Sequence, residues 1–171
     1  MAGAAFILLT GHGSGVPHVV TAPTNLGAYV KQPQLAVQMQ AKALQQEIVT
    51  QSAGEAKNVV YAVYEDSTGP AAKTGPQIVL FIGGNLSGSS ASSFISSFTG
   101  KLLGAWTTSA GSMGGNAACV PSENGRLAEC AWADNDTFGV VASPTLNASR
   151  LVGEMRQIRP MVEHRTSSNQ P

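Results

Sequence analysis

Apolar residues return every three or four positions in three segments of the chain, 34–51, 91–103 and 147–163. Most positions between them are polar, charged or small. This period predicts three amphipathic helices, each of which buries one face. The apolar positions are Val37, Ala41, Leu44 and Ile48, then Phe94, Ile95, Phe98 and Leu102, then Leu151, Met155, Ile158 and Val162.

Two runs between the helices are rich in β-branched and aromatic residues, as strands are. They are NVVYAVYE at 58–65 and QIVLFIGG at 77–84, and the turn-rich loop between them predicts a hairpin with a long connection. Three shorter strands are predicted at 116–120, 126–133 and 137–142, because Asn, Asp and Gly residues that favour tight turns separate them.

The predicted order is therefore helix, two strands, helix, three strands, helix. The expected fold class is α+β, with an antiparallel sheet of about five strands and three helices packed on it. We expect one domain over residues 26–165, an apolar and flexible segment over 1–25, and a disordered tail over 166–171. The expected core residues are Val60, Ala62, Val79, Phe81, Phe94, Phe98, Trp132, Val140, Leu151, Met155 and Ile158.

The first residues contain an apolar run, Ala2 to Leu9, followed by Gly-His-Gly-Ser-Gly. The run is short and no Lys or Arg precedes it, so it does not fit a secretory signal. It fits either the outer end of a transmembrane anchor with a flexible linker behind it, or a buried strand. The anchor interpretation places the rest of the chain outside the cytoplasm.

Composition excludes several classes of protein. The chain has 171 residues and is 43% hydrophobic, which excludes an intrinsically disordered protein. Only 12% of the residues are charged, and ten acids balance ten bases, so we expect no binding of nucleic acid through phosphate neutralisation. The printed sequence holds no run of 18 apolar residues, the length that a complete membrane span needs.

The sequence carries no recognisable catalytic or metal-binding motif. His12, His18 and His164 lack the spacing that presents two imidazoles to one metal ion. Ser14 lacks the glycines two residues away on either side that a nucleophile elbow requires. The glycine-rich turn at 83–88 matches no phosphate-binding loop. We therefore expect no catalytic residues, no metal and no cofactor.

Charge is distributed unevenly along the second half of the chain. Residues 116–137 contain four acids and one base, whereas residues 150–165 contain four bases and two acids. The acidic strands and the basic helix either attract each other within the fold, or the helix forms a partner-binding face. Such a face would use Arg156, Arg159 and Arg165.

The two cysteines, Cys119 and Cys130, fall in predicted strands that a turn at 123–125 joins. Antiparallel pairing brings such residues opposite each other, within reach of a disulfide bond. We therefore predict a disulfide between them, which also favours a location outside the reducing cytosol. The alternative is a pair of buried thiols that act as small hydrophobic residues.

One pattern in the second half carries a resemblance to a group of proteins. It consists of Cys119, the run Cys-Ala-Trp-Ala-Asp at 130–134, Phe-Gly-Val-Val at 138–141, and a following helix with Met-Arg, Ile-Arg and Val-Glu pairs. The pattern resembles uncharacterised proteins of actinobacteria, and the likeness covers roughly residues 26–165. It implies an N-terminal membrane anchor, a low-complexity linker and one extracytoplasmic α+β domain with a cystine hairpin. It implies no activity.

The expected function follows from these observations. We expect a non-catalytic, extracytoplasmic domain of a membrane-tethered protein that senses, scaffolds or binds an unknown cell-envelope protein or ligand. A structural protein of an envelope assembly has the same sequence features. The alternative is a hydrolase, or a carrier of a small apolar ligand, with a pocket between the helices and the sheet.

Overall fold

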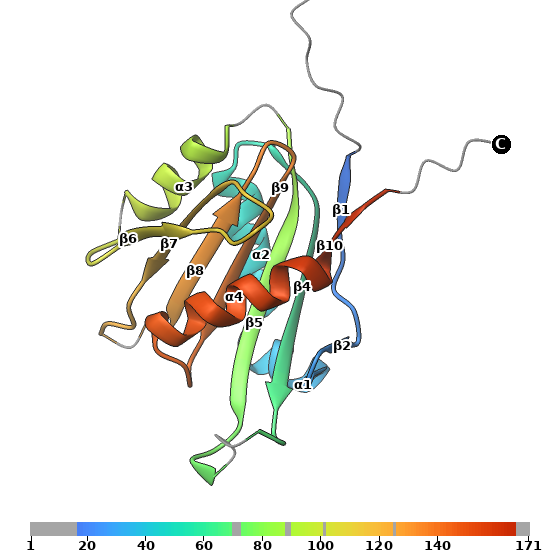
Figure 1. Cartoon of the computed structure of the whole chain (residues 1–171), viewed down its shortest axis with the longest axis vertical. Coiled ribbons are helices and arrows are strands. Elements are labelled where there is room, and N and C mark those ends of the chain that lie inside the picture. The colour runs from blue at the N-terminus through green and yellow to red at the C-terminus, as the bar shows by residue number, and fades with distance from the viewer. Residues whose placement is uncertain (1–16, 70–72, 88–89, 101, 125, 167–171) are drawn as a thin grey trace, which may run out of the picture.

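The computed structural model of the protein describes residues 17–69, 73–87, 90–100, 102–124 and 126–166. They form three layers, in which helices cover both faces of an antiparallel sheet (Figure 1). The helices are α1 (Pro33–Gln38), α2 (Ala41–Gln51), α3 (Ala91–Thr99) and α4 (Ala148–Val162). The strands are β1 (His18–Val20), β2 (Asn25–Leu26), β3 (Tyr29–Lys31), β4 (Ala56–Asp66), β5 (Gln77–Leu86), β6 (Trp106–Ser109), β7 (Asn116–Val120), β8 (Ala128–Ala133), β9 (Thr137–Ser143) and β10 (Glu163–Arg165).

The main sheet has eight strands in the order β2-β3-β4-β5-β9-β8-β7-β6, and all neighbours are antiparallel. The α+β class and the antiparallel sheet are therefore confirmed, but the predicted number of five strands is wrong. The strands β2, β3 and β6 are two to four residues long. Segments this short contain too few residues to show a hydrophobic period. Their pairing with neighbouring strands holds them in the sheet.

The structure has four helices among the described residues where the sequence predicts three. The segment predicted as one helix over 34–51 is divided into α1 and α2. Gln40 lies between them with a left-handed backbone, φ 53°. A left-handed residue cannot continue a right-handed helix, so the helix breaks at Gln40. The spacing of the apolar residues continues across this position and therefore does not reveal the break. The other two helices have the predicted places, and the side chain of Asn147 caps α4 by accepting a hydrogen bond from the Arg150 amide at 2.9 Å.

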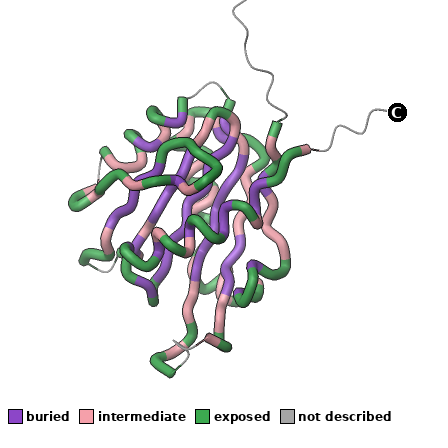
Figure 2. The backbone as a smooth tube through the Cα atoms, in the orientation of Figure 1, coloured by how far each residue is buried: buried purple, intermediate pink, exposed green. Residues whose placement is uncertain are grey.

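Successive side chains of the central strands point to opposite faces of the sheet, so the core has one part on each face. On β5, Val79 and Phe81 face the side that α4 covers, and Leu80 and Ile82 face the side that α1 and α2 cover. Both faces are covered, so the central strands are apolar at nearly every position. Figure 2 shows that the buried residues concentrate in these strands.

The core residues expected from the sequence lie where they were predicted, with three exceptions. Val60, Phe94 and Phe98 are only partly buried and pack at the margin of the core. The other members of the expected set are buried: Ala62, Val79, Phe81, Trp132, Val140, Leu151, Met155 and Ile158.

The N-terminal part of the described chain belongs to the fold. β1 pairs with β10 in a separate two-stranded sheet, in which His18 lies opposite Arg165. Residues 18–20, within the segment 1–25 that the sequence predicts as apolar and flexible, therefore form a strand. Residues 1–16, with the expected anchor, and residues 167–171 of the expected tail lie outside the described residues. Thr166 hydrogen-bonds to the Pro17 carbonyl through its amide at 3.1 Å and its hydroxyl at 2.8 Å.

The predicted disulfide is confirmed. Cys119 on β7 lies directly opposite Cys130 on β8, and the two Cα atoms are 4.0 Å apart. Both residues are fully buried, so the alternative of two free thiols is wrong. A buried structural cystine is typical of proteins that fold outside the reducing cytosol, and here it indicates an oxidising, extracytoplasmic environment.

The largest buried side chain, Trp132, depends on a glycine in the neighbouring strand. Trp132 on β8 lies opposite Gly139 on β9, and its ring stacks on Phe81 with centroids 6.0 Å apart. A Cβ atom on Gly139 would lie 2.1 Å from the Trp132 ring. The absence of a side chain at position 139 is therefore what lets the indole lie flat on the sheet.

We predict that Gly139→Ala lowers the free energy of unfolding by about 1–3 kcal/mol or more, because the methyl group displaces the Trp132 ring in a close-packed core. The measurement is urea unfolding followed by tryptophan fluorescence. Gly153→Ala is the matched control: no atom outside its own stretch of helix lies within 4 Å of the added Cβ, and alanine favours the helix by about 0.5–1 kcal/mol. Equal stability of the two variants would contradict the proposed role of Gly139.

Candidate functional site

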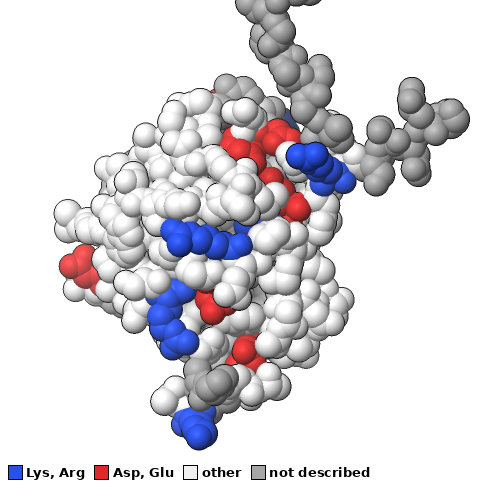
Figure 3. Space-filling view, in the orientation of Figure 1, with Lys and Arg blue, Asp and Glu red and all other residues white. Residues whose placement is uncertain are grey.

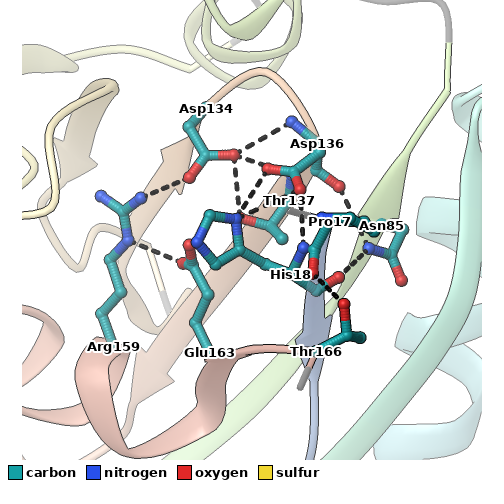
Figure 4. Close-up of polar contacts among 9 residues, drawn as sticks. All are labelled: Pro17, His18, Asn85, Asp134, Asp136, Thr137, Arg159, Glu163 and Thr166. Carbon is teal, nitrogen blue, oxygen red and sulfur yellow. Dashed lines mark hydrogen bonds and ion pairs between the residues drawn. The ribbon is translucent and has the colours of Figure 1, made fainter. Parts of the chain in front are cut away.

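Charged side chains gather where α4 and β10 meet the turn between β8 and β9 (Figure 4). Arg159 lies at the centre and is 1% exposed. Its Nε atom donates to Glu163 Oε2 at 2.9 Å, and a terminal nitrogen donates to Asp134 Oδ2 at 2.7 Å. The guanidinium also donates to the carbonyls of Ala110 and Gly114 in the loop between β6 and β7. One cation therefore joins four parts of the chain.

The Arg159 guanidinium also lies over the Trp132 ring, with Cζ 5.9 Å from the ring centroid. This distance fits a cation–π contact, which is stronger when both groups are removed from water. The Trp132 indole N–H has no hydrogen-bond partner among the described residues. The face of the indole, rather than its polar edge, is therefore what contacts the buried charge.

Asp134 is held by hydrogen bonds from its own turn as well as by Arg159. One carboxylate oxygen accepts from the amides of Asp136 and Thr137, at 3.1 and 2.8 Å, and from the Thr137 hydroxyl at 3.0 Å. Burial by itself raises the pKa of Asp134, but these hydrogen bonds outweigh it and hold the pKa below its ordinary value of 3.8. Asp134 is therefore a permanent anion at neutral pH.

A second polar contact fastens β1 to the same turn. The ring Nδ1 of His18 lies 3.2 Å from Asp136 Oδ2, and the His18 amide donates to that oxygen at 2.8 Å. Asn85 on β5 donates from its side chain to the His18 carbonyl at 2.8 Å. No local pattern predicts this contact, because His18 and Asp136 are 118 positions apart.

This polar cluster, which we define as Arg159, Glu163, Asp134, Asp136 and His18, fits a structural role. Each of its charged groups has a partner inside the cluster, and the His18 ring bonds to Asp136 alone among the described residues. The described residues contain no group of three His, Cys, Asp or Glu side chains arranged to hold a metal ion. The cluster therefore ties β1 and β10, the first and last described strands, to α4 and the β8–β9 turn.

The structure separates the three arginines of the expected partner-binding face. Arg159 is buried, so it cannot belong to such a face. Arg156 is exposed and donates to the Ser109 carbonyl and the Thr108 hydroxyl, each at 3.0 Å, and Arg165 is exposed on β10. Figure 3 shows Lys and Arg side chains dispersed over this face of the molecule, with wide uncharged areas between them.

The other interpretation, attraction between the acidic strands and the basic helix, is confirmed for one pair, Asp134 with Arg159. Asp136 bonds to His18 instead. Glu123 lies 4.0 Å from Arg126, three positions along the chain. Glu129 is half-buried, and burial raises its pKa. The positive charge of the nearby Arg126 lowers the same pKa by a smaller amount. Of the other histidines, His164 is exposed, and His12 lies outside the described residues.

Two adjoining surface grooves follow the outer edge of β4, on the side of α1 and α2. One groove of about 650 Å³ lies between α2 and the first residues of β4. The other, of about 710 Å³, lies between α1, α2 and the middle of β4, and Gln46 lines both. The first is lined by Gln45, Gln46, Val49, Thr50, Ala56, Lys57, Asn58 and Val59. The second is lined by Lys31, Gln32, Pro33, Ala36, Val37, Gln40, Lys42, Ala43, Gln46, Tyr61, Ala62 and Val63.

The grooves exist because β3 is much shorter than β4. β3 pairs with β4 only at Tyr64 and Glu65, so residues 56–63 of β4 have β5 on one side and no strand on the other within the described chain. A register shift between Lys57 and Val60 bends the start of β4. Sequence reasoning missed this region, because an unpaired edge depends on where a neighbouring strand ends.

We predict that Arg159→Met lowers the free energy of unfolding by about 3–5 kcal/mol, because removing one partner leaves the carboxylates of Asp134 and Glu163 uncompensated in a buried site. Chemical denaturation measures the change. Arg156→Met is the matched control on the same helix, and its exposed site predicts a change within about 0.5 kcal/mol. A loss at Arg159 no greater than at Arg156 would show that the cluster does not stabilise the fold.

A further prediction concerns pH. Because the folded pKa of Asp134 is lower than its ordinary value, its carboxylate stabilises the fold above pH 3.8, and this contribution disappears as the pH falls through the lowered pKa. Asp134→Asn should therefore cost about 1.5–3 kcal/mol at pH 7, the range for hydrogen bonds to charged groups. Unfolding curves from pH 7 to pH 2 should show this difference shrinking below pH 3.8, and a difference that grows there would contradict the assignment.

No helix among the described residues is long and apolar enough to cross a membrane. Comparison of the chain with protein-family models, with curated proteins and with solved structures finds no match.

Proposed function

We propose that this chain is a non-catalytic binding domain that works outside the cytoplasm, tethered to the membrane, and binds a component of the cell envelope. The observation that carries the proposal is the pair of grooves along β4. They place exposed apolar side chains beside an unpaired strand edge, and Val37 is 79% exposed there. Exposed apolar surface with a polar rim is typical of binding sites.

The polar cluster supports the non-catalytic part of the proposal. Arg159 is buried and paired with Asp134 and Glu163, and Asp136 bonds to the His18 ring, so the groups that could perform acid–base chemistry act on the fold instead. The polar side chains that line the grooves are lysines, glutamines, one asparagine, one threonine and one tyrosine, a set that suits binding better than catalysis.

The buried cystine supports the extracytoplasmic part, because such bonds persist mainly outside the reducing cytosol. The tether to the membrane and the identity of the partner as an envelope component rest on the sequence: the apolar run near residue 1 and the resemblance to anchored actinobacterial proteins.

A second candidate is a carrier of a small apolar ligand. The observation in its favour is the α1 side of the second groove, where Pro33, Ala36 and Val37 form an apolar wall between a helix and the sheet. Most of the lining residues of both grooves are exposed or only partly buried, however, so the site is open to water along its length. Carriers of apolar ligands enclose most of the ligand surface, which favours the binding domain as the first candidate.

We predict that a photo-crosslinking residue at position 37 of the full chain, expressed in its native cells, forms adducts with a component of the cell envelope. Position 157, which is exposed on α4, is the matched control and should form none. Alkylation of the same cell samples before reduction should find Cys119 and Cys130 oxidised.

Three outcomes would overturn the proposed function. Equal amounts of adduct from positions 37 and 157 would show that the groove is not the binding site. Free thiols at Cys119 and Cys130 in the native cells would exclude the extracytoplasmic location. A small apolar molecule crosslinked at position 37, with no envelope component, would favour the carrier.

A further inference from the structure

We propose that the occupant of the two grooves is an acidic, extended peptide segment of a second protein, which adds to the main sheet as a strand along the outer edge of β4. This inference rests on the proposed function and names the class of partner. It follows from three properties of the edge: its hydrogen-bonding groups, its charge and its length.

The hydrogen-bonding groups of the edge are available in its middle. At one end, the Val63 carbonyl accepts from the Gln32 amide at 2.7 Å, and at the other, the Val59 carbonyl accepts from the Gln45 side chain. Both carbonyls therefore point away from β5. Backbone groups two residues apart in a strand point the same way, so the N–H and C=O of Tyr61 also point outward. No hydrogen bond joins them to a described residue on that side.

The charge of the grooves selects an acidic partner. Lys31, Lys42 and Lys57 line them, and no Asp or Glu does. These are three of the five lysines in a chain whose formal net charge is zero. Among the described residues no carboxylate forms an ion pair with Lys42 or Lys57, and both side chains are exposed. A partner segment with carboxylates would supply the missing counter-charge and associate faster at low salt.

The length and the walls of the edge suit an extended segment. Residues 56–63 of β4 lack a neighbouring strand, and between the two glutamine contacts residues 60–62 leave room for about three residues of an extended segment at about 3.3 Å per residue. Side chains of an added strand alternate between the two faces of the sheet. On the helical face they would meet the apolar wall of Ala36 and Val37. This arrangement is the general mode of recognition by strand addition, with main-chain hydrogen bonds for affinity and side-chain contacts for specificity.

The opposite edge of the sheet offers less. It is formed by β6, which has four residues. The β4 edge also carries features that proteins use to prevent unspecific pairing, a bulge and an exposed lysine. The Gln32 and Gln45 contacts close its two ends and leave its middle open. An edge protected in this way favours a defined segment over pairing between copies of the same chain.

The test uses the full chain and a labelled eight-residue peptide of alternating glutamate and valine. Fluorescence anisotropy should show saturable binding that weakens with salt, and a peptide of alternating lysine and valine should not bind. Amide exchange should slow at Tyr61 when the acidic peptide is present, since that N–H gains an acceptor. Lys42→Glu with Lys57→Glu should weaken binding about tenfold or more, whereas Lys73→Glu, an exposed lysine outside the grooves, should leave it unchanged.

Each alternative result would overturn the inference. Equal binding of the lysine peptide would indicate unspecific strand pairing, and binding without protection of Tyr61 would indicate a surface charge contact. If the folded protein does not bind the acidic peptide at any concentration tested, this class of partner is excluded. The proposed function would still be judged by the adducts at position 37, so the two proposals can fail separately. Circular dichroism of the double variant confirms that loss of binding is not loss of folding.

Discussion

The buried guanidinium of Arg159 is the interaction on which the arrangement of this chain depends. It joins α4 to the β8–β9 turn through Asp134, to β10 through Glu163 and to the β6–β7 loop through two carbonyls. A buried cation is costly unless it is fully paired, so the four segments must come together for the site to be stable. The two-stranded sheet of β1 and β10, which holds both ends of the described chain, lies beside this cluster.

The same cation also fixes the centre of the sheet. The Arg159 guanidinium lies over Trp132, Trp132 stacks on Phe81, and Gly139 provides the space beneath the indole. The cystine in the neighbouring pair of strands holds β7 to β8. Covalent, aromatic and ionic contacts therefore all reinforce the α4 side of the sheet. This side of the sheet is therefore filled by contacts within the fold.

The edge of β4 differs from the centre because its neighbours end early. β3 covers two residues of an eleven-residue strand, and α1 and α2 form the wall of the space that β3 leaves. The protein carries few charges, yet three of its lysines line this space. No carboxylate lines the grooves, so none cancels the positive charge of these lysines there. The local excess of positive charge therefore attracts a negatively charged partner more strongly.

The sequence by itself determined the elements whose signal is local. The two amphipathic helices at α3 and α4, the β4–β5 hairpin, and the pairing of Cys119 with Cys130 follow from period, turn residues and spacing within about 35 positions. The tertiary structure alone decided what depends on distant segments: the break at Gln40, the short strands β2, β3 and β6, and the contact of His18 with Asp136. It also decided that Arg159 is buried and that β4 has an open edge. Burial and edge pairing are properties of what packs alongside, and no local pattern in the sequence records them.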